Sequence, residues 1–304
     1  MARTALAALV TLALVIVSHA APSSQAARSI PLVVSPAWVA ERLGTAELVL
    51  LHVGDKAEYE AAHIPGAQFI AVADVTVERD GLTNELPPVE KLQAAFEKVG
   101  VRDDSLIVVY VGRDTITPAG RILMTLDYLG LGDRTALLDG GLPAWRAEGH
   151  PFTSVATTPA SGKFTPHPRP EIIADLAFVR ANLNAASVTI LDARAPEFYS
   201  GESDNSGRIP RPGHIPGAGS VFYATLLESP QYPKLKDEAT LRKLFADAGA
   251  DPGDLVVTYC HTGQQASLLY FVARHLGYNV RLYDGSFQEW SANKDLPVEK
   301  RTRR

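Results

Sequence analysis

The chain has 304 residues, of which 46% are hydrophobic and 21% charged, with 29 Lys and Arg against 34 Asp and Glu. The formal net charge of -5 provides no basic footprint for nucleic acid. A single cysteine excludes both an intramolecular disulfide and a zinc site of the paired-cysteine kind. The length suffices for two domains of about 130 to 140 residues each.

The N-terminus has the features of a signal peptide at residues 1–20. Arg3 precedes an apolar run from Ala5 to Val17, and Ser18-His19-Ala20 has the small-residue spacing that signal peptidase recognises. The run is shorter than the roughly 20 residues needed to cross a bilayer. We therefore expect cleavage near Ala20 and an exported, soluble mature chain, either periplasmic or secreted.

Two halves of the chain repeat each other. The segment His-Ile-Pro-Gly-Ala begins at His63 and again at His214. An Asp-Gly pair, followed by a tryptophan, begins at Asp139 and again at Asp284. A period of roughly 140 to 150 residues that is repeated once indicates a duplicated domain rather than a solenoid.

Helical and strand patterns alternate within each half, as in α/β domains with a mainly parallel sheet covered by helices on both faces. In the first half, strands are predicted at 48–53, 106–111 and 135–138, and helices at 36–43, 89–99 and 119–129. We place the two domains at residues 31–152 and 171–298. The segment between them, 153–170, is rich in Pro, Thr, Ser and Ala and predicts an extended linker.

The cysteine, Cys260, follows an apolar strand predicted at 255–259 and precedes a helix predicted at 265–275, which Gly277 caps. A side chain there lies beneath unpaired N–H groups of a loop and a helix N-terminus, which favour negative charge. Lowering the thiol pKa from about 8.5 to about 6.5 needs roughly 2.7 kcal/mol. A helix end supplies about 0.3 to 2 kcal/mol and one charge-assisted hydrogen bond about 1.5 to 3 kcal/mol, so a thiolate is feasible.

Position alone leaves a second interpretation open, in which Cys260 is a buried small hydrophobe at a strand end. Export favours a functional role, because a lone cysteine in an oxidising compartment stays a free thiol. Such a thiol is a liability unless it is used or well buried.

The chain resembles the tandem-domain rhodaneses, the thiosulfate and 3-mercaptopyruvate sulfurtransferase family, over residues 31–298. The resemblance rests on the two His-Ile-Pro-Gly-Ala segments, the Asp-x-Arg at Asp192 and Arg194, and a six-residue loop that begins with Cys260 and has Gly263 fourth. The two Asp-Gly-(Gly/Ser)-x-x-x-Trp segments complete it. The order and duplication of these motifs make the match specific.

The resemblance implies two rhodanese-like domains and covalent catalysis in two steps. A Cys260 thiolate would attack the outer sulfur of thiosulfate, release sulfite, and pass the persulfide sulfur to a thiophilic acceptor such as cyanide or a thiol. The N–H groups of the following loop would hold the anion and the persulfide, like an oxyanion hole. These loop residues are His261, Thr262, Gly263, Gln264 and Gln265. No cofactor and no metal are expected.

Similarity further suggests that Arg194 faces the loop and binds the sulfonate or carboxylate of the donor. Asp192 is expected to orient Arg194 or the loop rather than to react. A surface salt bridge remains the alternative for Arg194. Arg208 and Arg211 are candidates for a second contact with the anion.

The first half lacks the residues that the chemistry needs. Val111 stands where the second half has its cysteine, Gly54 near the position of the arginine, and His52 at that of the aspartate. We therefore expect an inactive first domain. His63 and His214 are expected to pin turns rather than bind metal.

Other functions remain in competition. A phosphatase or arsenate reductase would need an arginine six positions after the cysteine, where this chain has Ala266. A non-enzymatic persulfide carrier or redox-sensing module, and a 3-mercaptopyruvate sulfurtransferase, both stay open. Thiosulfate is the favoured donor because His261 would add positive charge below a pH of about 6.5. The expected partners are a small donor and acceptor, with no nucleic acid and no membrane span; a protein acceptor is unknown.

Overall fold

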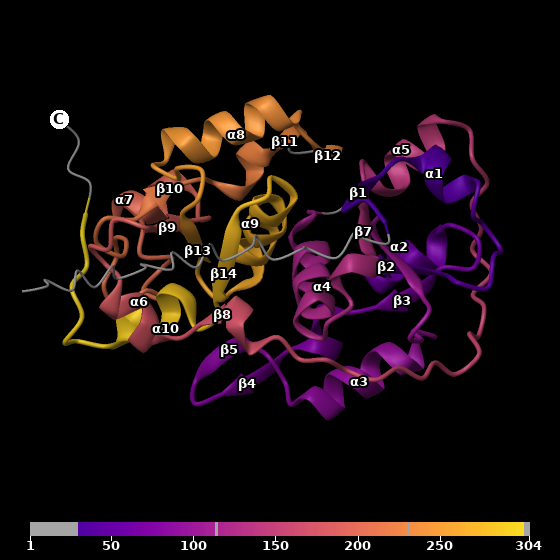
Figure 1. Cartoon of the computed structure of the whole chain (residues 1–304), viewed down its shortest axis with the longest axis horizontal. Helices are drawn as coiled ribbons and strands as arrows, with labels where there is room; N and C mark the ends of the chain where they lie inside the picture. The colour runs from indigo at the N-terminus through magenta and orange to yellow at the C-terminus, as the bar shows by residue number, and fades with distance from the viewer. Residues whose placement is uncertain (1–29, 113–114, 230–231, 301–304) are drawn as a thin grey trace, which may run out of the picture.

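The computed structural model describes residues 30–112, 115–229 and 232–300. The predicted signal peptide at 1–20 lies outside these residues. Two domains lie side by side, the first coloured indigo to magenta and the second orange to yellow in Figure 1.

The first domain is built on a five-stranded sheet in which every pair of neighbouring strands is parallel. Its order is β1 (Val33–Val34), β7 (Thr135–Leu138), β6 (Leu106–Val111), β2 (Leu48–Val53) and β3 (Gln68–Ile70). Its helices are α1 (Pro36–Ala40), α2 (Lys56–Ala61), α3 (Val89–Lys98), α4 (Thr117–Tyr128) and α5 (Gly141–Ala147). A hairpin of β4 (Val77–Arg79) and β5 (Leu82–Glu85) projects from it.

The second domain repeats this plan with a parallel sheet of its own. Its order is β10 (Gly219–Ser220), β9 (Val188–Asp192), β13 (Leu255–Tyr259), β14 (Asn279–Tyr283) and β8 (Ile173–Ala174). Its helices are α6 (Leu176–Ala181), α7 (Pro196–Ser200), α8 (Glu238–Asp247), α9 (Gln264–His275) and α10 (Ser286–Ala292). Its hairpin is β11 (Leu227–Ser229) with β12 (Tyr232–Leu235).

The predicted fold class is confirmed, and the four strands predicted above have the predicted bounds. The four predicted helices differ by one to three residues at one or both ends, and two of these differences have a clear cause. The helix predicted at 36–43 ends at Ala40 and continues as a turn that closes at Gly44, whose φ is +85°. The helix predicted at 119–129 begins earlier, at Thr117, because Pro118 is well suited to a first helical turn.

Alternate side chains of the central strands enter two different cores, because a strand has a side-chain period of two. In β6, Val109 and Val111 point to one face and Val108 and Tyr110 to the other. The core that contains Val111 continues into the second domain and contains Cys260. The two domains therefore share one hydrophobic core and pack against each other.

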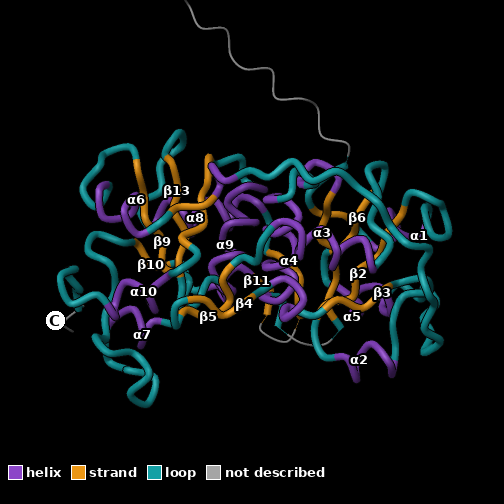
Figure 2. The backbone as a smooth tube through the Cα atoms, turned by 90° about the horizontal axis from the view of Figure 1, so that it is seen from below, coloured by secondary structure: helices purple, strands orange, loops and turns teal. Residues whose placement is uncertain are grey.

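Helices α4 and α9 carry this shared core, and Figure 2 shows them side by side between the two sheets. Their backbones come so close that a Cβ on Gly120 would lie 2.7 Å from the Cα of Leu268. A glycine is therefore needed on α4 at this crossing.

Strand register confirms how the halves correspond. His52 pairs with Tyr110 in the first sheet, and Asp192 pairs with Tyr259 in the second. The residues after the two tyrosines are thus equivalent, so Val111 occupies the position of the cysteine.

The segment after the first domain is extended, as its composition predicts. Residues 154–169 form no helix or strand and run along the first domain (Figure 1). Phe164 is buried there, and the N–H of His167 donates to the carbonyl of Leu129 at 2.9 Å.

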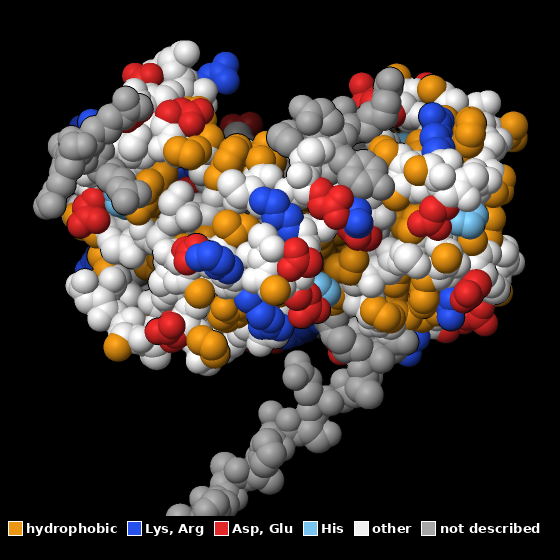
Figure 3. All heavy atoms as spheres, turned by 90° about the horizontal axis from the view of Figure 1, so that it is seen from above, with side chains coloured by type: hydrophobic (Ala, Val, Ile, Leu, Met, Phe, Trp, Pro, Cys, Tyr) orange, Lys and Arg blue, Asp and Glu red, His pale blue; other side chains and the backbone are white. Residues whose placement is uncertain are grey.

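Acidic and basic side chains are interspersed on the face that Figure 3 shows, without a large field of one sign. Across the described ranges, no helix is both long and apolar enough to span a bilayer.

Substituting Val111 by alanine should destabilise the protein without changing the reactivity of its thiol. Val111 is 1% exposed in the shared core, so we expect a loss of about 1 to 3 kcal/mol in the free energy of unfolding, measured by urea denaturation. The alkylation rate of Cys260 in folded protein should be unchanged. A large change in that rate would show that the first domain's loop contributes to the thiol's environment.

Candidate active site

Cys260 lies at the C-terminal end of β13 and is 1% exposed. Its backbone N–H donates to the hydroxyl of Ser286 at 3.2 Å. The carbonyls of Cys260 and His261 accept hydrogen bonds from the N–H groups of Phe287 and Gln288, at 2.9 and 3.0 Å. These donors are free because the first N–H groups of α10 have no partner within the helix.

With these carbonyls turned outward, the loop directs its N–H groups at the sulfur. The backbone N–H groups of Thr262, Gly263, Gln265 and Ala266 hydrogen-bond the sulfur of Cys260, and we call these four groups the sulfur cradle. Three of these residues, Thr262, Gly263 and Gln265, are among the five loop residues predicted from sequence, and Ala266 is not.

Gly263 makes this curvature possible. Its φ is +86°, which glycine adopts without a steric penalty. A Cβ at this position would also lie 3.0 Å from an Asp284 carboxylate oxygen and 3.2 Å from Nη1 of Arg121. Both backbone conformation and lack of space therefore require glycine, and α9 begins at the next residue.

Burial raises the pKa of the Cys260 thiol above its ordinary value, although the four N–H groups of the sulfur cradle lower it. The sequence argument showed that a lowered thiol pKa is energetically feasible, whereas burial makes the net direction upward. The sequence argument counted the favourable dipoles but not the loss of hydration, which penalises the charged form.

Arg194 does not offer its charge to solvent. It is fully buried, and it donates from Nε to Oδ1 of Asp192 at 2.9 Å and from Nη2 to Oδ2 at 2.5 Å. Nη2 also donates to the carbonyl of Gly213 at 2.7 Å, and the guanidinium lies 4.0 Å from the ring centroid of Phe287. Asp192 thus orients Arg194 as expected. Its third nitrogen, Nη1, is buried and has no hydrogen-bond partner. That Arg194 binds the donor stays a prediction.

His261 is neutral at physiological pH. Burial, followed by repulsion from Arg194, lowers the pKa of His261 to about 4. Its ring meets that of Phe198 edge to face, with 4.6 Å between centroids. The expectation that His261 becomes charged below about pH 6.5 is therefore wrong.

Arg208 and Arg211 were predicted to contact the anion, and the structure shows what each of them does. Arg208 is exposed, and its backbone N–H donates to the carbonyl of Asn205. Arg211 donates to four backbone carbonyls around the end of α10, those of Trp290, Ser291, Asn293 and Leu296. The guanidinium of Arg211 is thereby committed to holding that helix end, which corrects its assignment as an anion contact.

The two His-Ile-Pro-Gly-Ala histidines pin turns, as predicted. Nδ1 of His63 lies 2.6 Å from the carbonyl oxygen of Tyr59, and Nδ1 of His214 lies 2.7 Å from that of Tyr199. Each imidazole also stacks on the ring of the same tyrosine. In the part of the chain that the structure describes, no group of three or more His, Cys, Asp or Glu side chains could hold a metal ion.

The first domain reaches the Cys260 loop through residues that the sequence did not single out. Asn84 donates from Nδ2 to the hydroxyl of Thr262 at 2.9 Å. Arg121 of α4 is fully buried and donates from Nη1 to Oδ1 of Asp284 at 2.5 Å. Because these pairs join distant parts of the chain, no local sequence pattern could have revealed them.

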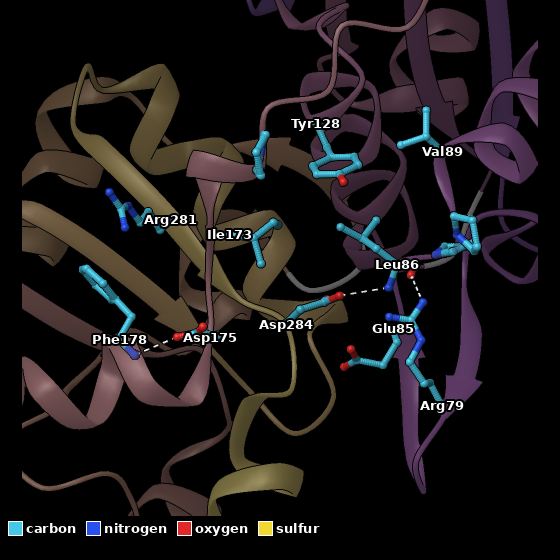
Figure 4. A pocket seen from close by; sticks show the side chains of 13 residues that line it. Arg79, Glu85, Leu86, Val89, Tyr128, Ile173, Asp175, Phe178, Arg281 and Asp284 are labelled. Carbon is cyan, nitrogen blue, oxygen red and sulfur yellow. Dashed lines mark hydrogen bonds between the residues drawn. The ribbon is translucent and has the colours of Figure 1, made fainter.

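A pocket of about 670 Å³ opens between the domains beside this contact. Figure 4 shows Asp284 on one wall bonded to the N–H of Leu86 on the other, with Glu85 and Arg79 nearby. Burial, followed by repulsion from Asp284, raises the pKa of Glu85 to about 7. This pocket is therefore lined by ionisable groups of both domains.

The fold and the site define a class of protein: a duplicated α/β chain in which one domain holds a lone cysteine beneath backbone N–H groups, suited to carrying a negatively charged sulfur. A family model described as "Rhodanese-like domain" matches residues 35–148 and 175–293. The chain belongs to the rhodanese family.

Curated relatives extend this likeness over most of the chain. A thiosulfate sulfurtransferase of Azotobacter vinelandii is 33% identical over 272 residues, covering 89% of this chain and 98% of its own. A 3-mercaptopyruvate sulfurtransferase of Escherichia coli K12 is 29% identical, covering 80% and 85%. The solved structure of SseA from Escherichia coli superposes with a TM-score of 0.75 at 26% identity, covering 84% of this chain and 99% of that one.

The rate of Cys260 alkylation by iodoacetamide should keep rising with pH beyond 9. The reason is that the folded thiol has a raised pKa, so the thiolate fraction is small at pH 7 and grows as pH passes that value. No inflection near pH 6.5 is expected, because the pKa of His261 is about 4. Glutathione measured in parallel serves as the unperturbed reference. A rate that reaches its plateau below pH 8 would contradict the raised pKa.

Proposed function

We propose that this chain is a sulfurtransferase that moves the sulfane sulfur of thiosulfate to a thiophilic acceptor through a persulfide on Cys260. The observation that carries the proposal is the sulfur cradle, four N–H groups aimed at one buried sulfur. Curated relatives named thiosulfate sulfurtransferase, at 32% to 33% identity, support it.

The reaction proceeds in two displacements at sulfur. The Cys260 thiolate attacks the outer sulfur of thiosulfate, the sulfur–sulfur bond of the donor breaks, and sulfite leaves with its electron pair. An acceptor such as cyanide then attacks the terminal sulfur of the persulfide, which forms thiocyanate and returns the thiolate. The sulfur cradle stabilises the negative sulfur in both steps, as an oxyanion hole stabilises oxygen.

A raised thiol pKa is compatible with this chemistry. It lowers the thiolate fraction at neutral pH, but intrinsic nucleophilicity toward sulfur rises with pKa. The buried thiol is therefore less prone to unspecific reaction in the free protein, while its thiolate is a strong nucleophile once formed.

The charge states of the residues around the loop bear on the choice of donor. Arg194 is paired with Asp192, Arg121 is paired with Asp284, and His261 carries no charge near pH 7. The argument for thiosulfate from a protonated histidine thus fails, and the preference rests on the named relatives. A 3-mercaptopyruvate sulfurtransferase remains the second candidate, because a relative of that name also aligns over 80% of the chain.

Replacing Cys260 by serine should abolish both turnover and loading. Without the thiolate, no persulfide forms, so thiocyanate production from thiosulfate and cyanide should fall to background. Intact mass spectrometry after exposure to donor should also lose the gain of about 32 Da, one sulfur atom. Circular dichroism of the variant is the control for folding. Retained turnover would refute the mechanism, and loading without turnover in the wild type would indicate a persulfide carrier.

Comparing the two donors on purified mature protein tests the assignment of thiosulfate. Initial rates with thiosulfate and with 3-mercaptopyruvate, each at pH 6 and pH 8, give kcat/KM for both donors. A higher value for 3-mercaptopyruvate at both pH values would overturn thiosulfate as the donor and leave the persulfide mechanism intact.

We further propose that the chain is exported, on the basis of the apolar run from Ala5 to Val17 and the cleavage pattern at Ser18-His19-Ala20. N-terminal sequencing of the native protein should then begin near Ala21, with the activity in the periplasmic or secreted fraction. An intact Met1 in the cytosolic fraction would contradict export.

A further inference from the structure

The hairpin of β4 and β5 crosses from the inactive domain to the Cys260 loop. Asn84, a residue of β5 with φ of +63°, donates from Nδ2 to Oγ1 of Thr262 at 2.9 Å. The backbone of this segment is held on both sides of the contact. Nη2 of Arg121 donates to the carbonyl of Asn84, and the N–H of Leu86 donates to Oδ2 of Asp284 at 3.0 Å. Asn84 is therefore fixed relative to the loop that it touches.

The duplicated architecture supplies an internal comparison. The hairpin of β11 and β12 crosses in the opposite direction, and the N–H of its Leu235 donates to Oδ1 of Asp139 at 3.0 Å. This contact matches that of Leu86 with Asp284, so the residue two positions earlier, Pro233, is the counterpart of Asn84. Proline has no polar side-chain group. The two hairpins thus share their main-chain contact with an aspartate. Only the hairpin that reaches the Cys260 loop has a polar side chain, Asn84, at the compared position.

Thr262 is well placed to meet a donor. It lies two residues after Cys260, its backbone N–H bonds the sulfur, and its side chain is partly exposed. Arg194 and Arg121 are each paired with a buried aspartate, so the hydroxyl and N–H dipoles of the loop contribute to contacts with the negative end of the donor.

A threonine hydroxyl has one hydrogen to donate and two lone pairs that accept. Because the amide of Asn84 occupies a lone pair of Thr262, the O–H is directed away from Asn84. We propose that Asn84 is a positioning residue, supplied by the inactive domain, that turns the Thr262 hydroxyl toward the anionic group of the sulfur donor. An asparagine amide does not titrate, so this orientation holds across the working pH range.

The proposal rests on the proposed function and is tested by deleting the Asn84 side chain. Asn84→Gly is the cleanest deletion, because glycine tolerates the positive φ without strain. The KM for thiosulfate should rise about three- to tenfold, as expected for loss of one hydrogen bond, with kcat within about twofold. Asn84→Asp should raise KM further, because a carboxylate accepts the O–H and repels the anion.

Thr83→Ala is the matched control on the same hairpin. Thr83 also crosses the domain interface, where its N–H and hydroxyl both bond Oε1 of Gln288 at 3.1 Å, but it does not contact the Cys260 loop through these bonds. This variant should keep the wild-type KM. An equal rise in KM for Thr83→Ala and Asn84→Gly would assign the effect to general hairpin docking and overturn the proposal.

A double-mutant cycle isolates the pair. If Asn84 acts through Thr262, then Asn84→Gly in a Thr262→Val background should add less than about a twofold change in KM. Fully additive effects, or a wild-type KM in Asn84→Gly itself, would overturn the proposal.

A second measurement separates failure of this proposal from failure of the proposed function. The ratio of Cys260 alkylation rates by iodoacetate and by iodoacetamide reports how well the loop receives an anion, without any sulfur transfer. The ratio should fall in Asn84→Gly and stay unchanged in Thr83→Ala. An unchanged ratio in Asn84→Gly refutes the positioning role, whereas a wild type that does not turn over thiosulfate refutes the function alone.

Discussion

The active site depends on the orientation of a few peptide planes after Cys260. Their carbonyls are turned outward by the N-terminal N–H groups of α10, which leaves the opposite N–H groups to converge on the sulfur. The turn closes at Gly263, against the buried ion pair of Arg121 with Asp284. Removing one partner of such a pair typically costs about 3 to 5 kcal/mol, because the other charge remains buried. The geometry of the sulfur cradle is thus tied to the stability of the domain interface.

Strand patterns and register could be predicted from the sequence because they are local or repeated. The period of two in residues 106–111 sets which side chains enter which core. The internal repeat shows from the sequence alone that Val111 is equivalent to the cysteine, and the strand register agrees. The pairing of Asp192 with Arg194 was also foreseeable, since two residues at this spacing follow one strand end.

Charge states and long-range contacts could not be predicted in the same way. The pKa values of Cys260 and His261 are set by burial, which depends on how completely other segments cover the loop. Arg211 looked like a free cation in the sequence, yet its guanidinium holds four carbonyls at the end of α10. Asn84 lies 178 residues from Thr262, beyond the reach of any local pattern.

The exchange of hairpins makes each domain part of the structure of the other. Each domain places a hairpin against the aspartate of the other, and α4 and α9 share a core that neither domain completes alone. In the first domain Val111 replaces the nucleophile, which removes the chemistry but keeps an apolar side chain in that core. The same domain contributes Asn84, which bonds Thr262 of the Cys260 loop, and Arg121, which bonds Asp284 beside that loop. The first domain therefore contributes structurally to the candidate site of the second, and the unit that carries this site is the pair of domains.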